Sequence, residues 1–122
     1  MVILGARALG LEFAQMYAHM GTSVTLLQRS RRIAPEEEPV ISDELRKYLE
    51  EEGIRIHTSV QVKRIYSRDG GTVVRGSHYG KTFEARGETF LLATGREPNT
   101  RNLWPRASGS ETRAGWISEG EP

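Results

Sequence analysis

Residues 2–12 constrain this chain most, because they join a short apolar run, a glycine turn and the start of an amphipathic segment. They read Val-Ile-Leu-Gly-Ala-Arg-Ala-Leu-Gly-Leu-Glu. A strand that turns at a glycine into a helix is the phosphate-binding part of many dinucleotide sites. Gly5 and Gly10 hold the first and third glycine positions of the G-x-G-x-x-G pattern, and Arg7 stands at the second. The turn predicts either a dinucleotide site or an ordinary strand–helix connection.

Each position of this turn has its own chemical reason. Gly5 allows a sharp turn with positive φ, and Gly10 allows the helix to pack closely on the strand. The backbone amides of residues 6–10 lack intrahelical acceptors and lie at the positive end of the helix dipole, where a pyrophosphate fits. The guanidinium of Arg7 is expected to pair with phosphate or to be a surface group. The candidate residues of the turn are Gly5, Ala6, Arg7, Ala8, Leu9 and Gly10.

Composition limits the classes of function. The chain has 122 residues, enough for one domain, with 37% hydrophobic and 27% charged residues, as in ordinary soluble domains. A net charge of +1 gives no reason to expect nucleic acid, and no apolar window approaches a membrane span. The absence of cysteine excludes disulfides, thiolate metal sites and a cysteine nucleophile within this sequence. We see no signal peptide and expect a cytoplasmic protein.

Hydrophobic periodicity predicts a strand–helix–strand unit at the start. Residues 2–4 are expected to form a buried strand, and residues 23–27 a second strand parallel to it. Between them an apolar stripe at helical spacing predicts a helix that ends at Gly21. The stripe consists of Leu9, Phe13, Met16, Tyr17 and Met20.

The next segment predicts a second helix and a third strand. Pro39 suits the first turn of a helix, which is expected to end at Gly53. The apolar face of this helix comprises Ile41, Leu45, Tyr48 and Leu49. Residues 54–58 alternate and are expected to form the third strand.

The following region changes character. Short strand-like runs at 60–66, 72–75 and 81–85 are separated by turn signals, which predicts an antiparallel three-stranded meander. Residues 89–93 form another apolar strand. The expected fold class is α/β: a Rossmann-like parallel sheet flanked by helices, with the meander inserted before the last parallel strand.

Three separated segments carry a resemblance to a known family. They are the glycine turn with Gly-Leu-Glu-Phe-Ala-Gln at 10–15, the run Val-Thr-Leu-Leu-Gln-Arg-Ser at 24–30, and Leu-Leu-Ala-Thr-Gly-Arg-Glu-Pro-Asn-Thr at 91–100. Their order and spacing resemble the NAD(P)H-binding domain of the FAD-dependent pyridine nucleotide–disulfide oxidoreductases, and within that family the mercuric reductases. The family also includes dihydrolipoyl dehydrogenase and glutathione reductase. The resemblance covers residues 1–103 as an NAD(P)H-binding domain, and residues 104–122 are expected to be an irregular tail.

The resemblance implies that separate domains bind the nucleotide, bind FAD and form the dimer. In this family the NAD(P)H domain passes hydride to FAD on a preceding domain, a cysteine pair then reduces the substrate, and a further domain forms the homodimer. We expect this chain to be a truncated middle domain that is not catalytic alone. FAD would be held by a domain absent from this chain.

The resemblance also implies roles for single residues. Glu12 matches the glutamate that contacts the nicotinamide carboxamide, although a structural role near the helix dipole is the alternative. Ala8 matches a position that carries an aromatic gate in some members, so an open pocket is expected. The backbone of Val62 is expected to approach the adenine, with plain sheet packing as the alternative. Gly95 is expected near the nicotinamide.

The segment after the second predicted strand bears on the choice of nucleotide. NADH sites usually carry an acid there, which binds the ribose hydroxyls and would repel an extra phosphate. Gln28 removes that repulsion, and arginine forks suit a 2′-phosphate. This favours NADPH over NADH, with an unliganded basic loop as the alternative. The candidate residues here are Gln28, Arg29, Ser30, Arg31 and Arg32, of which Arg29 matches best.

Other assignments stay open. His19, His57 and His78 lie apart in the sequence without partners at ligand spacing, so we expect surface or strand histidines and no metal site. A FAD-binding Rossmann domain would want an acid at position 28, as would a methyltransferase that binds S-adenosylmethionine. A non-catalytic nucleotide sensor or an inert truncated product is a further possibility. The terminal electron acceptor is not encoded in this sequence.

Overall fold

The computed structural model describes residues 1–96, as two helices and seven strands. The proposed tail at 104–122, and the end of the family motif at 97–100, lie outside the described residues. The elements in chain order are β1 (Val2–Leu4), α1 (Ala8–His19), β2 (Thr25–Leu27), α2 (Pro39–Glu51), β3 (Arg55–His57), β4 (Val60–Arg68), β5 (Gly71–His78), β6 (Lys81–Gly87) and β7 (Phe90–Leu92).

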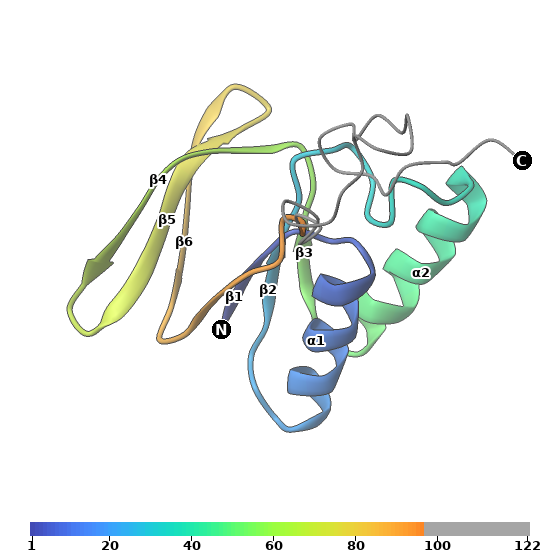
Figure 1. The fold of residues 1–122 in the computed structure, drawn as a ribbon, viewed down its shortest axis with the longest axis horizontal. Helices are drawn as coiled ribbons and strands as arrows, with labels where there is room; N and C mark the ends of the chain where they lie inside the picture. The colour runs from blue at the N-terminus through green and yellow to red at the C-terminus, as the bar shows by residue number, and fades with distance from the viewer. Residues whose placement is uncertain (97–122) are drawn as a thin grey trace, which may run out of the picture.

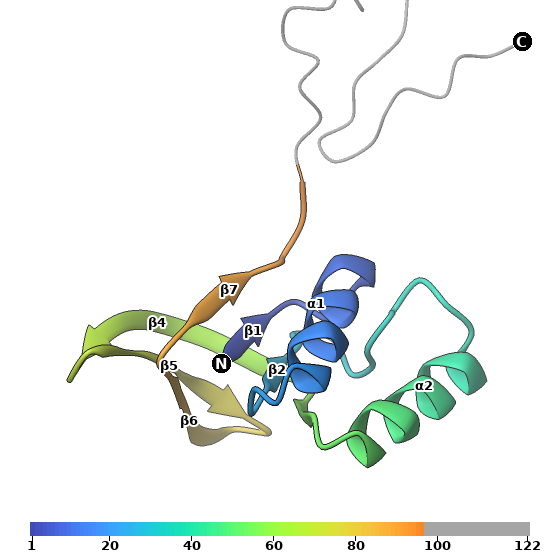
Figure 2. The same ribbon diagram turned by 90° about the horizontal axis from the view of Figure 1, so that it is seen from below.

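The short strands form a parallel sheet in the order β3-β2-β1-β7. Ile3 pairs with Leu26 of β2 on one side and with Leu91 of β7 on the other. β7 follows the meander in sequence yet lies next to β1 (Figure 2). The carboxyl ends of β1, β2 and β7 therefore meet at one edge of the sheet. This confirms the expected α/β class.

The predicted meander is confirmed as an antiparallel sheet in the order β4-β5-β6. Asp69 and Gly70 at the first turn, and Tyr79 and Gly80 at the second, all have positive φ. Two consecutive residues with positive φ make the type I′ turn, whose twist suits a tight hairpin. The turn signals thus set the register of the meander.

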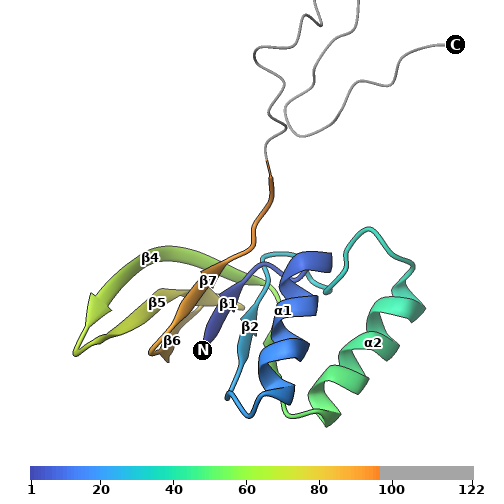
Figure 3. The same ribbon diagram turned by 60° about the horizontal axis from the view of Figure 1, so that its bottom comes forward.

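The three layers enclose two separate cores. α1 and α2 cover one face of the parallel sheet, and the meander lies on the other side (Figures 1 and 3). Ile3 and Leu26 point towards the helices, where they join Leu11 and Ala14 of α1. Alternate strand residues point the other way, because successive side chains in a strand face opposite sides. They pack against the meander in a second core that includes Val2, Leu27, Val74 and Ala85.

The predicted apolar stripes of both helices are partly wrong. In α1 the buried residues are Gly10, Leu11 and Ala14, whereas Met20 is 70% exposed. At Gly10 the helix lies so close to the turn that a Cβ atom would overlap the carbonyl oxygen of Gly5. Leu9 and Met16 are also exposed, while Phe13 and Tyr17 are partly buried.

In α2 the buried residues are Ser42 and Leu49, with Leu45 partly buried. Ile41 and Tyr48 are exposed, against expectation. Pro39 begins the helix as predicted. Within the described residues, neither α1 nor α2 is both long and apolar enough to cross a membrane.

Candidate nucleotide site

The glycine turn is held by close backbone packing. Gly5 has φ of +109°, and a Cβ atom there would overlap the carbonyl oxygen of Ala93. A Cβ atom on Gly10 would overlap the carbonyl oxygen of Gly5. The predicted reasons for both glycines are thus confirmed, since Gly5 needs positive φ and Gly10 needs close approach. These contacts bring β7, the turn and α1 together.

The amides of the turn are not all free, which corrects one expectation. The N–H of Ala6 donates to Oε1 of Gln28 at 3.0 Å, in a buried hydrogen bond. The first helical bond runs from the N–H of Leu11 to the carbonyl of Arg7, which is the N-cap. The amides of residues 7–10 have no acceptor among the described residues. The anion-binding end of α1 therefore consists of residues 7–10.

A cleft of about 550 Å³ opens at the edge where β1, β2 and β7 end. Six of the predicted site residues line it: Gly5, Arg7, Gln28, Arg29, Ser30 and Val62. Five further lining residues were not predicted: Leu4, Pro35, Val60, Ala93 and Thr94. Ala93 and Thr94 follow β7 directly, as expected for a ligand crevice beyond the carboxyl ends of parallel strands. Their position at the end of a predicted parallel strand was the sequence signal that could have identified Ala93 and Thr94.

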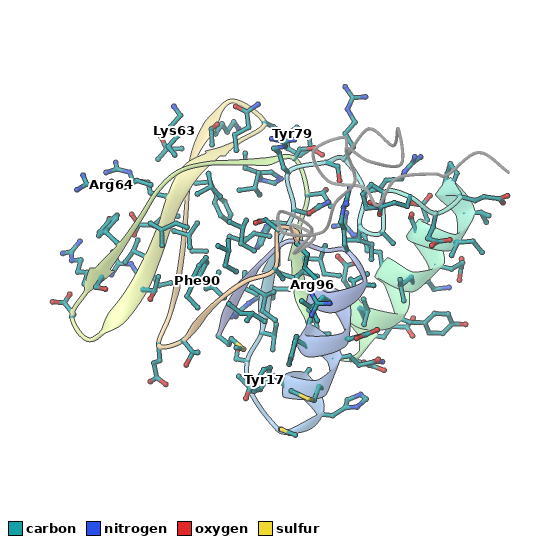
Figure 4. All side chains as sticks on the ribbon, viewed as in Figure 1. Tyr17, Lys63, Arg64, Tyr79, Phe90 and Arg96 are labelled. Atoms are coloured by element: carbon teal, nitrogen blue, oxygen red, sulfur yellow. The ribbon has the colours of Figure 1, made fainter. Side chains whose placement is uncertain are left out.

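A second hollow of about 400 Å³ is lined in part by the loop after β2, which also lines the cleft. Arg29 lines both spaces. The hollow is lined by Arg29, Arg31, Ser59, Gln61, Ser77, Tyr79 and Gly80. Figure 4 shows Tyr79 at the end of the meander that faces this loop, whereas Lys63 and Arg64 lie along its outer side. The carboxyl end of β2 is thus surrounded by positive charge, without a carboxylate among the described lining residues.

A family model described as pyridine nucleotide-disulphide oxidoreductase matches residues 1–119. The chain belongs to this family. Mercuric reductase of Lysinibacillus sphaericus is 36% identical over 121 residues, which cover 92% of this chain and 20% of that protein. The probable pyridine nucleotide-disulfide oxidoreductase RclA of Escherichia coli is 33% identical over 107 residues, 88% of this chain and 23% of that protein.

A solved structure leads to the same family. The HOCl-induced flavoprotein disulfide reductase RclA from Escherichia coli matches with a TM-score of 0.78 at 28% identity, covering 98% of this chain and 27% of that one. The resemblance read from the motifs is thereby confirmed. The chain spans about a fifth of the length of the curated relatives it matches.

In this oxidoreductase-family domain, Arg7 stands at the mouth of the cleft in an ion pair. Its Nη2 lies 2.6 Å from Oε1 of Glu36, and both side chains are largely exposed. Arg7 lines the cleft, so its guanidinium is within reach of a ligand there. A bound anion would compete with Glu36 for it.

Other predicted residues of the family site do not line either space. They are Ala6, Ala8, Leu9, Gly10, Glu12, Arg32 and Gly95. Glu12 is the fifth residue of α1, so it lies beyond the first turn, where the helix dipole would favour an acid most. Gly95 is exposed beyond β7 with φ of +151°. Ala8 and Leu9 are the first two residues of α1. Their backbone amides have no acceptor among the described residues, so these amides, and not the side chains, are what they offer to an anion.

His57 lies in β3 and His78 in β5, which confirms the expectation of strand histidines, and the structure brings the two rings together. Their ring centroids lie 5.9 Å apart, and both rings contact Phe83. Burial, and then the nearby His78, lower the pKa of His57 below its ordinary value. His19 also has a partner, since its Nε2 lies 3.2 Å from Oε2 of Glu52. Among residues 1–96 no metal-binding group of three or more His, Asp or Glu side chains occurs.

Proposed function

We propose that this chain binds NADPH as the nucleotide domain of a flavin-dependent disulfide oxidoreductase similar to mercuric reductase. In the complete protein, hydride would pass from the nicotinamide to FAD and on to a redox cysteine pair. FAD, the cysteine pair and the dimer contacts would belong to other domains, and the complete protein would be a homodimer. A cytoplasmic location stays a prediction.

The cleft fits a dinucleotide chemically. Its volume of about 550 Å³ lies within the range of small-molecule sites. The free amides of residues 7–10 suit the pyrophosphate, with Arg7 as a nearby cation. Val60 and Val62 offer an apolar wall on the side of β4, which suits an adenine ring. The nicotinamide would then lie towards Thr94, at the end of β7.

One observation carries the preference for NADPH. The position after β2, where NADH sites usually place an acid, holds Gln28, and the cation Arg29 lines both the cleft and the hollow. A 2′-phosphate at this rim would meet Arg29 and Arg31 without a carboxylate among the described lining residues. A guanidinium binds phosphate through paired, charge-assisted hydrogen bonds.

The bound nucleotide would supply the hydride, and the chain would supply binding and orientation. The amides of residues 7–10 fix the pyrophosphate, and Arg29 fixes the adenosine end. Together these contacts orient the nicotinamide towards a flavin on another domain.

The test is calorimetric titration of the full 122-residue chain with NADPH, NADH and FAD, with circular dichroism to verify folding. NADPH is expected to bind more tightly than NADH. Arg29→Ala should lower the affinity for NADPH about tenfold or more and leave NADH unchanged, because it removes a charge-assisted hydrogen bond. Arg32→Ala is the matched control, since Arg32 shares the loop but lines neither space.

Equal affinity for both nucleotides, unchanged by Arg29→Ala, would overturn the assignment to NADPH. Tight binding of FAD would instead favour a flavin-binding Rossmann domain. A flat titration on a folded sample would favour a domain without a nucleotide ligand.

A further inference from the structure

A chain of side-chain hydrogen bonds joins the glycine turn to the loop after β2. The N–H of Ala6 donates to Oε1 of Gln28 at 3.0 Å. Nε2 of Gln28 donates to Oγ of Ser30 at 2.7 Å. Oγ of Ser30 in turn donates to the carbonyl oxygen of Arg32 at 2.6 Å. Gln28 is 9% exposed, so both of its polar atoms are committed to the protein.

The chemistry of the two ends fixes the direction of every bond. A backbone N–H can only donate, so Gln28 must present its oxygen to Ala6 and its nitrogen to Ser30. A backbone carbonyl can only accept, so Ser30 must give its own proton to Arg32. A carboxylate at position 28 would lack the donor for Ser30. A carboxamide at position 28 therefore completes this series of hydrogen bonds, and a carboxylate does not.

Backbone bonds hold both ends of the same loop. The N–H of Ser59 donates to the carbonyl of Ser30 at 2.9 Å, and the N–H of Ala34 donates to the carbonyl of Ala6 at 2.7 Å. Between these two bonds, the contact from Ser30 to the Arg32 carbonyl limits how the loop can move. We call the hydrogen bonds from Ala6 through Gln28 and Ser30 to Arg32 the relay. The relay sets the path of the loop segment that follows Arg29 and carries Arg31.

We infer that Gln28 and Ser30 are positioning residues for nucleotide choice, and not ligands of the nucleotide. Through this relay the amides that suit the pyrophosphate and the arginines that suit the 2′-phosphate keep one relative geometry. This inference rests on the proposed function. It implies that the preference for NADPH depends on two side chains whose polar atoms bind only protein groups.

The experiment measures the affinities of the full chain for NADPH and NADH in four variants. Gln28→Met keeps the length of the side chain and removes both of its hydrogen bonds, and Ser30→Ala removes the middle of the relay. Each should lower the ratio of the two affinities about three- to tenfold, the usual worth of a hydrogen bond. The double variant should lower the affinity ratio no further than either single variant, because the two substitutions interrupt the same series of hydrogen bonds. Ser30→Thr keeps the hydroxyl and should keep the ratio.

A second readout does not need a nucleotide. Gln28→Met should speed hydrogen exchange of the Ala6 amide and raise the backbone mobility of residues 30–33 in NMR relaxation. Ser30→Ala should raise the mobility and leave exchange at Ala6 unchanged.

The outcomes separate the two proposals. If the wild type prefers NADPH and Gln28→Met keeps that preference, the relay is overturned and the proposed function stands. A loss in Ser30→Ala alone would mean that Ser30 contacts the nucleotide directly, which also overturns the inference. If the wild type binds neither nucleotide, the proposed function fails. Unchanged loop mobility in Gln28→Met would then overturn the positioning role as well.

Discussion

Gly10 lies so close to the carbonyl group of Gly5 that no side chain fits between them. Gly5 in turn packs against the carbonyl of Ala93, so the backbone of α1 follows the end of β7 through the turn. Of the turn residues, Gly5 and Arg7 line the cleft, so α1 begins beside the edge where β1, β2 and β7 end. The close contact between the two glycines is what places the helix N-terminus at the cleft.

Gly10→Ala is expected to destabilise the fold by about 1–3 kcal/mol or more, because the added methyl group overlaps backbone that cannot move freely. Gly21→Ala is the matched control: a Cβ atom there meets nothing within 4 Å, and the cost comes from φ of +84° alone. Urea unfolding measures both free energies. A cost for Gly10→Ala no larger than that for Gly21→Ala would contradict the close packing.

Much of the fold could be predicted because local signals agree with the tertiary structure. The glycine turn, Pro39 at the start of α2, and the turns at 69–70 and 79–80 each marked an element correctly. These glycine, proline and turn residues act through the backbone conformations that they favour, and those preferences can be read from the local sequence.

The rest depended on contacts between distant segments. The capture of the Ala6 amide by Gln28 joins residues 22 positions apart and leaves no local signature. The apolar lining residues Leu4 and Val60 carry no chemical mark of a site. The buried face of α1 was misjudged because its large apolar residues suggested the core, whereas Gly10 and Ala14 make the close contact.

That misjudged face gives a direct prediction. Ala14 is fully buried against the sheet, so Ala14→Leu should overpack the core and lower stability by about 1–3 kcal/mol. Met20→Ala should change stability by less than about 0.5 kcal/mol, because Met20 is 70% exposed. Thermal and urea unfolding of both variants checks this. A larger loss for Met20→Ala than for Ala14→Leu would mean that the predicted stripe was correct.

The ion pair between Arg7 and Glu36 at the mouth of the cleft leads to a prediction about nucleotide affinity. Glu36→Gln removes the partner of Arg7 and should leave stability within about 1 kcal/mol, since exposed ion pairs contribute little. If Arg7 then turns to a phosphate, the affinity for NADPH should rise about two- to fivefold at low salt and less at high salt. Glu37→Gln is the control, an exposed neighbour that lines neither space. An unchanged affinity in Glu36→Gln would show that Arg7 is a surface residue only.

The histidine contact between β3 and β5 predicts a dependence of stability on pH. Burial lowers the pKa of His57, and the charges of His78, Arg55 and Arg46 lower it further, while Glu50 opposes them. A histidine with a lowered pKa in the folded state takes up its proton more readily in the unfolded chain. Its contribution is therefore present above about pH 6.5, the unfolded value, and is lost as the pH falls towards the lower folded pKa.

Urea unfolding at pH 7.5 and pH 5.5 measures this contribution. The wild type should be less stable at the lower pH, and His57→Gln should reduce that difference because the titrating group is gone. His78→Gln should reduce it in part, since it removes one of the charges that oppose protonation of His57. Both pH values lie above the ordinary pKa of carboxyl groups, which keeps most Asp and Glu residues ionised throughout. The same pH dependence in the wild type and in His57→Gln would contradict the lowered pKa.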